Sequence, residues 1–187
     1  MQKYFAAATF VLLVVAVVIR AQLMRRKGIR AVLFGQIDRL DFLLPPFALF
    51  YFYLIIANAF SLPTVGKELF SIGVIAWIGV LLCLLGIALF AVALVSFKDS
   101  FRVGIDTDHA DKLITTGIFA FSRNPIYVAF SLVLLGQFLV YSNWIMLIYL
   151  AAGASLLPRQ VLREEDFLRG HYGKEYQEYC KRVRRYL

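Results

Sequence analysis

Charged residues are scarce in this sequence, and long stretches contain none. Only 17% of the 187 residues are Asp, Glu, Lys or Arg, whereas 61% are hydrophobic. A soluble domain has about 25% charged and roughly 45–50% apolar residues, so the composition argues against a water-soluble fold. The apolar excess lies in four uncharged runs, at residues 4–19, 42–66, 69–97 and 124–158.

The sequence also lacks the short motifs of several enzyme classes. It has no G-x-G-x-x-G, P-loop, H-E-x-x-H or G-x-S-x-G pattern, which argues against a Rossmann-type nucleotide site, a zincin and an α/β-hydrolase. Cys83 and Cys180, the two cysteines, have neither metal-ligand nor redox spacing, so we expect no disulfide framework and no metal site. The middles of the uncharged runs hold no acidic or basic side chain, which argues against ion or proton transport.

The uncharged runs have the length and character of membrane-spanning helices. A spanning helix needs about 20 apolar residues, and these runs are apolar on all sides, whereas the strands of a membrane barrel alternate. The fourth run is too long for one helix and is interrupted at Tyr141-Ser142-Asn143-Trp144, so we expect a helical hairpin. We predict an all-α, polytopic membrane helix bundle in a single domain, with five spans at about 4–23, 42–63, 69–97, 125–141 and 144–158, and C-terminal amphipathic helices at 159–169 and 174–185.

Two glycines in the third span bear on how these helices pack. Gly79 and Gly86 are seven residues apart and share one helix face, which favours a closely packed neighbouring helix. Glycine that is merely tolerated in lipid is the alternative.

Basic residues gather in three segments. Of the 20 Lys and Arg residues, six lie between the first two runs, four between the third and fourth, and eight after Pro158. With five crossings these segments fall on one side, and short basic loops stay in the cytoplasm. We therefore expect an integral protein of a bacterial-type inner or plasma membrane, with the N-terminus outside, the C-terminus cytoplasmic and no nucleic-acid partner. Lys3 before an apolar run also fits a secretory signal, but the Arg25-Arg26-Lys27 cluster that follows favours a retained anchor.

Two polar segments, 98–124 and 159–187, bracket the predicted hairpin and should meet at its cytoplasmic mouth. Arg123 stands beside a helix start pre-set by Pro125, where exposed backbone N–H groups attract anions. Glu164 and Glu165 point about 100° apart on a helix, as 3.6 residues per turn requires. One of them can therefore face the bundle, where a carboxylate stabilises a cation or acts as a base.

The same tail carries an aromatic stripe. Tyr172, Tyr176 and Tyr179 are spaced by four and three residues, so they share a helix face that can wall a pocket for a flat ring, a sulfonium or an ammonium group. His109 and His171 are weaker candidates for a catalytic role. For each feature a plainer interpretation stays open at this point: an interfacial loop, a solvated helix end or an aromatic belt.

Taken in order, these segments resemble the superfamily of isoprenylcysteine carboxyl methyltransferases and phospholipid methyltransferases. The resemblance covers residues 111–187, about 40% of the chain. The residues that carry it are Lys112-Leu113-Ile114-Thr115-Thr116-Gly117-Ile118-Phe119, Arg123-Asn124-Pro125-Ile126-Tyr127, Glu164-Glu165, Tyr172-Gly173-Lys174-Glu175-Tyr176-Gln177-Glu178-Tyr179 and Arg182-Val183.

The resemblance implies an integral membrane enzyme that transfers a methyl group from S-adenosylmethionine to a lipophilic acceptor arriving from the bilayer. The acceptors of such enzymes include prenylcysteine carboxylates, phospholipid amines and small lipid thiols. By position, the implied catalytic residues are Glu165, Arg123 and Glu164, with Glu165 the first candidate for removing a proton or steadying the sulfonium. The implied cofactor-binding residues are Leu113, Gly117, Arg123, Asn124, Pro125, Tyr127, Glu164, Tyr172 and Tyr176.

Two departures from the family pattern affect the expected substrate. Asn124 stands where the eukaryotic carboxyl methyltransferases have histidine, and an amide cannot carry that histidine's proton. Gly117-Ile118-Phe119 replaces Gly-Pro-Tyr. Two other functions remain as alternatives: an NADPH-dependent enzyme resembling the sterol reductases, and a non-enzymatic membrane adaptor whose basic tail binds anionic lipid.

Overall fold

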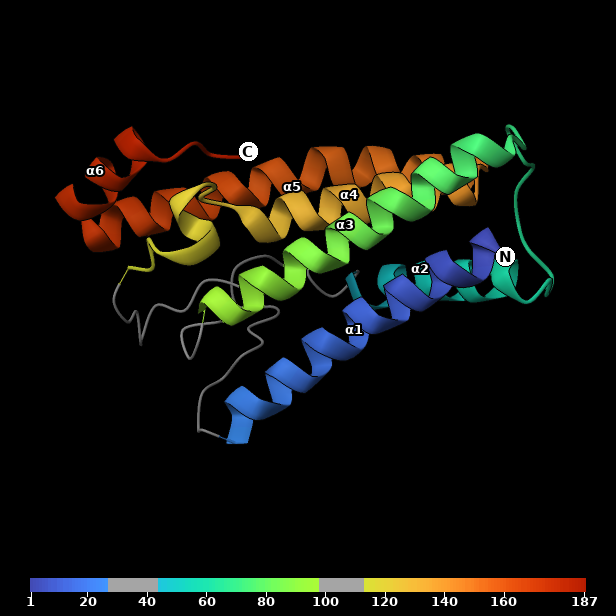
Figure 1. Ribbon diagram of the computed structural model, residues 1–187, viewed down its shortest axis with the longest axis horizontal. Coiled ribbons are helices and arrows are strands. Elements are labelled where there is room, and N and C mark those ends of the chain that lie inside the picture. The colour runs from blue at the N-terminus through green and yellow to red at the C-terminus, as the bar shows by residue number, and fades with distance from the viewer. Residues whose placement is uncertain (27–43, 98–112) are drawn as a thin grey trace.

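The computed structural model describes residues 1–26, 44–97 and 113–187, and every regular element in this part of the chain is a helix. Figure 1 shows the elements in order. They are α1 (Gln2–Arg26), α2 (Leu44–Ala59), α3 (Gly73–Phe97), the 3-10 helix η3 (Gly117–Ala120), α4 (Pro125–Val140), α5 (Trp144–Tyr172) and α6 (Lys174–Arg182). Pairing between extended residues is limited to isolated bridges within these ranges. The all-α prediction is confirmed.

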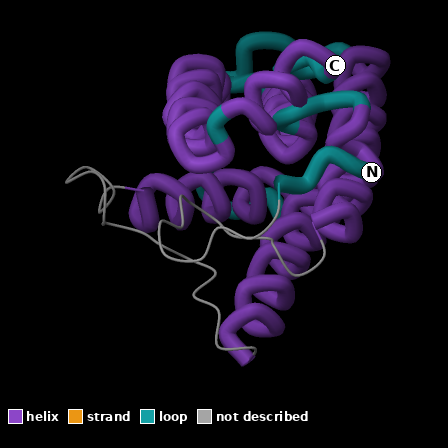
Figure 2. Tube along the Cα trace, turned by 90° about the vertical axis from the view of Figure 1, so that its left-hand side faces the viewer, coloured by secondary structure: helices purple, strands orange, loops and turns teal. Residues whose placement is uncertain are grey.

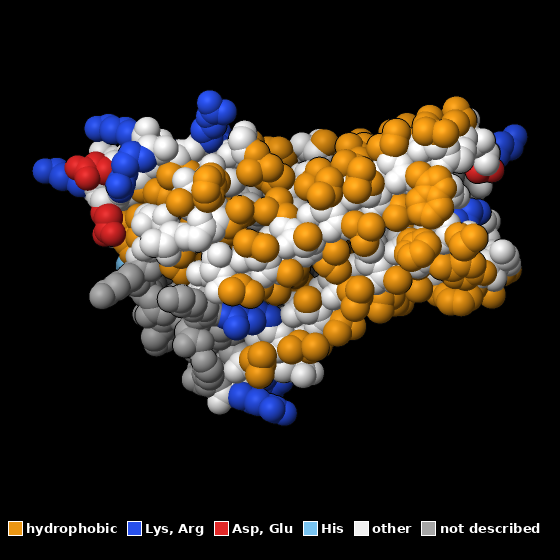
Figure 3. Space-filling view, in the orientation of Figure 1, with side chains coloured by type: hydrophobic (Ala, Val, Ile, Leu, Met, Phe, Trp, Pro, Cys, Tyr) orange, Lys and Arg blue, Asp and Glu red, His pale blue; other side chains and the backbone are white. Residues whose placement is uncertain are grey.

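Helices α1, α3, α4 and α5 run lengthwise through the molecule in Figure 1, whereas α2 lies in the right half; Figure 2 views the helices from the left-hand end. Among the described residues, α1, α3 and α5 are long and apolar enough to cross a membrane. Helices α2 and α4 are also apolar but have 16 residues each, about 24 Å at 1.5 Å per residue, which is less than the roughly 30 Å hydrocarbon core. Figure 3 shows that apolar side chains cover the middle of the visible face, with charged ones toward its ends.

The connection between α2 and α3 is longer than the sequence suggested. We expected helix at 42–63 and from residue 69, but α2 ends at Ala59 and α3 begins at Gly73; residues 42 and 43 lie outside the described residues. The backbone N–H of Leu69 donates to the carbonyl of Ser142 (2.6 Å), whose hydroxyl donates to the carbonyl of Phe70. Leu69 and Phe70 therefore hydrogen-bond to the α4–α5 turn and not to other residues of a helix.

Helices α3 and α4 pack with their backbones in contact. A Cβ added at Gly79 would lie 2.6 Å from the carbonyl oxygen of Gly136, and one at Gly136 would lie 2.5 Å from that of Gly79. At Gly86 an added Cβ would meet the carbonyl oxygen of Ala129 at 2.9 Å. The close approach predicted from Gly79 and Gly86 is confirmed, and α4 is the partner.

The predicted hairpin is present as α4 and α5, but the boundary at residue 158 is wrong. We expected a separate helix at 159–169, whereas α5 continues without a break through Pro158 to Tyr172. A proline inside a helix removes one backbone hydrogen bond, a loss that membrane helices tolerate when neighbouring groups compensate. The glutamates in the polar half of α5 bond to Arg123, Asn124 and Tyr127 at the start of α4, and these contacts stabilise the continuous helix.

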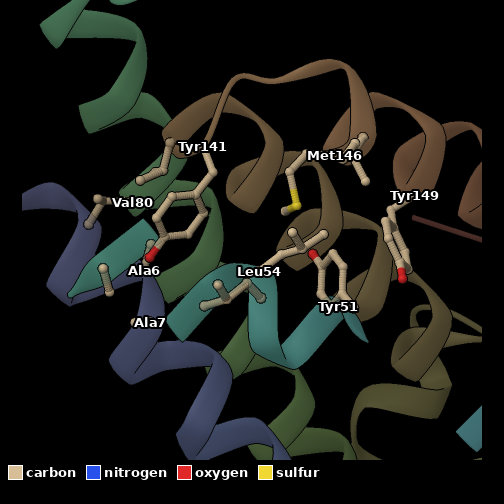
Figure 4. Packing of buried hydrophobic residues seen from close by; sticks show 12 residues of the cluster. Ala6, Ala7, Tyr51, Leu54, Val80, Tyr141, Met146 and Tyr149 are labelled. Atoms are coloured by element: carbon tan, nitrogen blue, oxygen red, sulfur yellow. The ribbon is translucent and has the colours of Figure 1, made fainter. Parts of the chain in front are cut away.

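The core at the other end of the bundle is rich in tyrosine (Figure 4). The rings of Tyr51 on α2 and Tyr149 on α5 have centroids 4.7 Å apart, and the hydroxyl of Tyr149 donates to the carbonyl of Phe47 at 2.8 Å. Leu54 and Met146 are buried in the same cluster. Helix α2 is thereby anchored to α5, and α1 to α5 pack together as one bundle.

Candidate functional site

The predicted site segments meet where α3 ends and α4 begins, at the left of Figure 1. Gly117 opens η3 with a positive φ of 64°, and a Cβ there would lie 2.6 Å from the hydroxyl of Ser96 on α3, so both backbone conformation and space favour glycine. The Ser96 hydroxyl accepts from the N–H of Ile118 (3.4 Å), and Phe119 packs edge-on against Phe97. These contacts fix the chain that leads into α4.

Arg123, just before α4, is tied to Glu165 of α5. Its Nε and Nη2 donate to Oε1 of Glu165 at 3.2 and 3.1 Å, and the amide of Asn124 donates to the same oxygen at 3.0 Å. Glu165 is only 1% exposed. The anion expected at this helix start is thus supplied by the protein itself, as a buried carboxylate on a neighbouring helix.

The C-terminal segment closes over this pair. Nε of Arg185 donates to Oε2 of Glu165 at 3.0 Å, and Nη2 of Arg185 lies 2.9 Å from the same oxygen as an ion pair. Nη1 of Arg123 donates to the carbonyls of Cys180 and Val183 at 3.1 and 3.0 Å, and the backbone N–H of Arg123 donates to the carbonyl of Arg184 at 3.0 Å. Both oxygens of Glu165 are occupied by charged or amide donors, so this carboxylate joins α4, α5 and the C-terminal segment.

The charge state of Glu165 follows from these partners. Burial favours the neutral acid, but the hydrogen bonds from Arg185, the charge and hydrogen bonds of Arg123, and the Asn124 amide outweigh it and lower the pKa of Glu165 below the ordinary 4.5. At neutral pH it is a carboxylate held between two guanidinium groups.

Acid should therefore release the C-terminal segment. Because the folded pKa of Glu165 is depressed, its stabilisation is fully present above pH 4.5 and is lost as pH falls through the lower folded value. We expect amide exchange at residues 176–186, corrected for intrinsic rates, to accelerate as the pH falls below 4.5. Exchange in the middle of α3 serves as the internal reference, and equal acceleration there would contradict the assignment to Glu165.

Glu164, the adjacent residue, has different surroundings. The hydroxyl of Tyr127, in the first turn of α4, donates to its Oε1, and the amide of Gln160, one turn earlier on α5, donates to the same oxygen at 3.2 Å. Burial raises the pKa of Glu164 above the ordinary 4.5, and the two hydrogen bonds only partly offset this. The two glutamates therefore differ in kind: Glu165 is ion-paired, whereas Glu164 has neutral partners.

The tyrosine stripe packs on the site instead of standing open to solvent. Tyr176 and Tyr179 are buried with Val183, and Leu113 and Tyr172 pack against this cluster. The hydroxyl of Tyr179 donates to the carbonyl of Phe119 at 2.7 Å, and burial raises the pKa of Tyr179 to about 12. The buried hydroxyl oxygen of Tyr176 lacks a hydrogen-bond partner among the described residues.

The structure thus brings together most of the predicted site residues. Arg123, Asn124 and Glu165 bond directly, Tyr127 bonds to Glu164, and Pro125 begins α4. Gly117 shapes the loop before them, while His171 is exposed and stacks on Phe167. His109 lies outside the described residues. In the part of the chain that the structure describes, no cluster of three or more His, Cys, Asp or Glu residues could hold a metal.

Two contributors were missed in the sequence. Gln160 is four residues before Glu164, the spacing that places side chains together on a helix, and could have been found on that basis. Arg185 had no such signal, since it is one of several basic residues near the C-terminus. Only the fold selects it as the partner of Glu165.

Comparison with known proteins indicates the family of this chain. No curated protein matches the chain significantly. A family model described as Phospholipid methyltransferase matches residues 74–175, a region that includes nearly all of α3, the whole of α4 and α5, and both glutamates. The match reaches further toward the N-terminus than the resemblance seen in the motifs and stops just before Tyr176. Because it covers more than half of the chain, the protein belongs to the phospholipid methyltransferase family.

Proposed function

We propose that the protein is an S-adenosylmethionine-dependent methyltransferase that acts on a lipophilic acceptor in the membrane. The observation that carries the proposal is the position of the carboxylate site within the family match, where α4 and α5 leave their apolar segments. A methyltransferase for lipids needs its polar reaction centre at that level. Membrane lipids supply both the surroundings and the acceptor.

The residues present suit a sulfonium cofactor. Glu164 offers a half-buried carboxylate, and the rings of Tyr127, Tyr172 and Tyr176 lie at the same end of the bundle. Carboxylates and aromatic faces both stabilise a cation. When bound, S-adenosylmethionine supplies an electrophilic methyl group. The protein's own task is positioning, which is the main requirement of such a transfer.

Arg123 and Glu165 contribute by holding this end of the bundle together. Through them the start of α4, the polar half of α5 and the segment after α6 share one hydrogen-bonded centre. Leu113 and Gly117 fix the preceding loop, with Leu113 packed on the tyrosine cluster. We infer that the cofactor binds among these elements, with Asn124 and Pro125 at the start of α4 forming one side.

The same reasoning extends to the membrane arrangement. We propose five crossings, with α2 and α4 as the short ones, and the basic ends of the helices in the cytoplasm. The arrangement is supported by Arg25 and Arg26 at the end of α1 and by Lys181 and Arg182 at the end of α6. Short basic segments stay cytoplasmic, so the cofactor site would open to the compartment that supplies S-adenosylmethionine.

Equilibrium binding to detergent-purified protein tests the cofactor. We expect titration calorimetry to detect binding of S-adenosylmethionine and not of NADPH. Arg123→Ala should weaken S-adenosylmethionine binding at least tenfold, about 1.4 kcal/mol, because it removes the hydrogen bonds that join the start of α4 to the C-terminal segment. The matched control is Arg169→Ala, which removes an exposed arginine paired with Asp166. Absence of heat with S-adenosylmethionine, or binding of NADPH in its place, would reject the proposal.

The acceptor is then found by incubating the protein with methyl-labelled cofactor and total membrane lipid. Label in a lipid fraction supports a lipid methyltransferase and identifies the fraction. A tail that binds anionic vesicles in a salt-sensitive way, without any cofactor binding, would instead indicate the adaptor function.

A further inference from the structure

The connection between α2 and α3, residues 60–72, is a non-helical segment with an apolar surface. This α2–α3 segment lies at the right of Figure 1, at the end of the bundle opposite the glutamate site. Five of its large apolar side chains are exposed by 48 to 61%: Phe60, Leu62, Val65, Leu69 and Ile72. In Figure 3, apolar side chains continue almost to the right-hand end, whereas charged side chains gather at the left-hand end. A contiguous exposed apolar patch of this kind marks an interaction surface.

The backbone of the α2–α3 segment is fixed by hydrogen bonds. The chain reverses at Ser61, which has a φ of 55°, and the N–H of Leu62 donates to the carbonyl of Ala57 at 2.8 Å, closing the end of α2. The hydroxyl of Tyr53 donates to the carbonyl of Pro63 at 2.7 Å. Together with the bonds to the α4–α5 turn described above, these contacts hold the segment so that it presents its apolar side chains outward.

Aromatic side chains surround this segment. Trp77 on α3 and Trp144 on α5 are about half exposed, and the ring of Tyr4 on α1 packs edge-on against Phe60 with centroids 5.8 Å apart. A Cβ added at Gly66 would lie 3.2 Å from the indole nitrogen of Trp144, so this tryptophan packs beside the segment. Tryptophan and tyrosine gather where a membrane meets water. The aromatic residues therefore mark that level, and the α2–α3 segment shares it.

Two physical limits decide how deep the segment can lie. Non-helical backbone exposed to lipid is not tolerated in the hydrocarbon core, because its N–H and C=O groups find no partners there. Full exposure to water would instead leave the apolar patch unburied. The headgroup region satisfies both groups of atoms. Lys67, which is exposed, suits the same region, since its stem can lie along apolar surface while its ammonium group reaches a lipid phosphate.

We propose that the α2–α3 segment is a lipid-binding surface that lies in the headgroup region of the bilayer, with Phe60, Leu62 and Val65 against the acyl chains. Its partner is a phospholipid surface, recognised by apolar contact and by Lys67 on a phosphate. The surface is continuous with the apolar side chains that cover the middle of the bundle. This role goes beyond methyl transfer and does not depend on it.

Such an anchor also sets the depth of the glutamate site. From Trp144 to Glu164, α5 advances 20 residues without a break, about 30 Å at 1.5 Å per residue. The hydrocarbon core is roughly 30 Å thick. With the α2–α3 segment in the headgroups at one boundary, the polar half of α5 therefore begins at the other.

Quenching of tryptophan fluorescence tests this placement without cofactor or turnover. Trp77 and Trp144 are the two tryptophans of the chain, and both lie at this end of the bundle. In vesicles of phosphatidylcholine and phosphatidylglycerol, we expect lipid brominated near the headgroup to quench the wild type more strongly than lipid brominated near the chain end. Acrylamide, which stays in water, should quench less than either lipid.

A tryptophan placed within the segment reports on it directly. In a Trp77→Phe/Trp144→Phe background, Phe60→Trp should show the same preference for bromine near the headgroup. Two controls in this background fix the scale. Leu85→Trp, at an exposed position in the middle of α3, should be quenched most by bromine near the chain end. Glu178→Trp, at an exposed position on α6, should be quenched by acrylamide alone.

Charges introduced into the segment give a second measurement. In a Trp77→Phe background, Leu62→Asp/Val65→Asp should raise acrylamide quenching of Trp144 several-fold, because carboxylates draw the segment out of the headgroups into water. Both positions are exposed, so the change removes no core contact. Leu62→Ile/Val65→Ile keeps the apolar surface and should behave like the wild type.

Three results would overturn the proposal. Quenching of Phe60→Trp by acrylamide and not by lipid would show a hydrated loop, and the same result for the wild type would reject the placement without any substitution. Protection from both quenchers would mean that protein, such as a second copy of the chain, covers the segment. Strongest quenching by bromine near the chain end would place it in the hydrocarbon core. Binding of S-adenosylmethionine is measured separately, so this inference and the proposed function can fail independently.

Discussion

Replacing Glu165 with glutamine is expected to detach the C-terminal segment from α4. Glutamine is nearly the same size, but it leaves Arg123 and Arg185 facing a neutral amide, whose nitrogen would also oppose one of them. Arg123 is the more costly to abandon, since its side chain is only 10% exposed. Removing one partner of a buried ion pair costs about 3–5 kcal/mol, more than a short segment can recover from other contacts.

Limited trypsin digestion followed by mass spectrometry measures this effect. Cleavage after Arg182, Arg184 and Arg185 should be much faster in Glu165→Gln than in the wild type, while cleavage after Arg25 should not change. Glu178→Gln has the same chemistry at an exposed position and should behave like the wild type. Unchanged cleavage near the C-terminus would mean that the aromatic cluster around Tyr176 suffices to hold this segment.

Substituting Gly136 with leucine should strongly destabilise the apolar part of the bundle. A Cβ at this position would lie 2.5 Å from the carbonyl oxygen of Gly79 and 2.9 Å from the backbone nitrogen of Cys83. Backbone atoms cannot turn aside as a side chain does, so α3 and α4 must separate. Overpacking a core costs typically 1–3 kcal/mol, and we expect a loss of about 3 kcal/mol here. Thermal unfolding of detergent-purified protein, followed by circular dichroism, measures it.

Another glycine provides the control for this experiment. An added Cβ at Gly170, near the end of α5, meets nothing within 4 Å. Gly170→Ala should therefore raise stability by roughly 0.5–1 kcal/mol, the usual gain from alanine inside a helix. Gly136→Ala should fall between the two. If Gly136→Leu unfolds at the temperature of the wild type, the backbone contact between α3 and α4 is not a determinant of stability.

The order of the helices could be predicted from the sequence, whereas the residues at which they begin and end could not. Uncharged runs locate α1 to α5 because burying a charge in lipid is costly, and Tyr141-Ser142-Asn143-Trp144 gives the hairpin turn because those residues interrupt the longest run. The start of α3 follows a stretch in which Leu69 and Phe70 hydrogen-bond to Ser142, and these contacts are tertiary. Pro158 suggested a helix end, but packing of the polar half of α5 on α4 carries the helix through it.

The residues of the candidate site could be expected to lie together, but the hydrogen bonds among them could not be predicted from the sequence. Arg123 and the glutamate pair were correctly brought to one place by the hairpin. Which glutamate faces which partner depends on a rotation of about 100° per residue along α5, and the sequence does not give the phase of that rotation. The choice of Arg185 depends in turn on how α6 folds back, since its neighbours are equally basic.

The glycine contact between α3 and α4 and the tyrosine cluster of α6 are stabilised in different ways. Lipid tails are as apolar as the helices, so α3 and α4 are held by close van der Waals contact without any gain from excluding water. The cluster of Tyr176, Tyr179 and Val183 excludes water and depends on that exclusion. Urea weakens the burial of apolar groups from water, so we expect it to act first on the polar end of the molecule, while α3 and α4 remain joined. The apolar and polar parts of the molecule are thus stabilised in different ways, and the proposed cofactor site lies at the boundary between them.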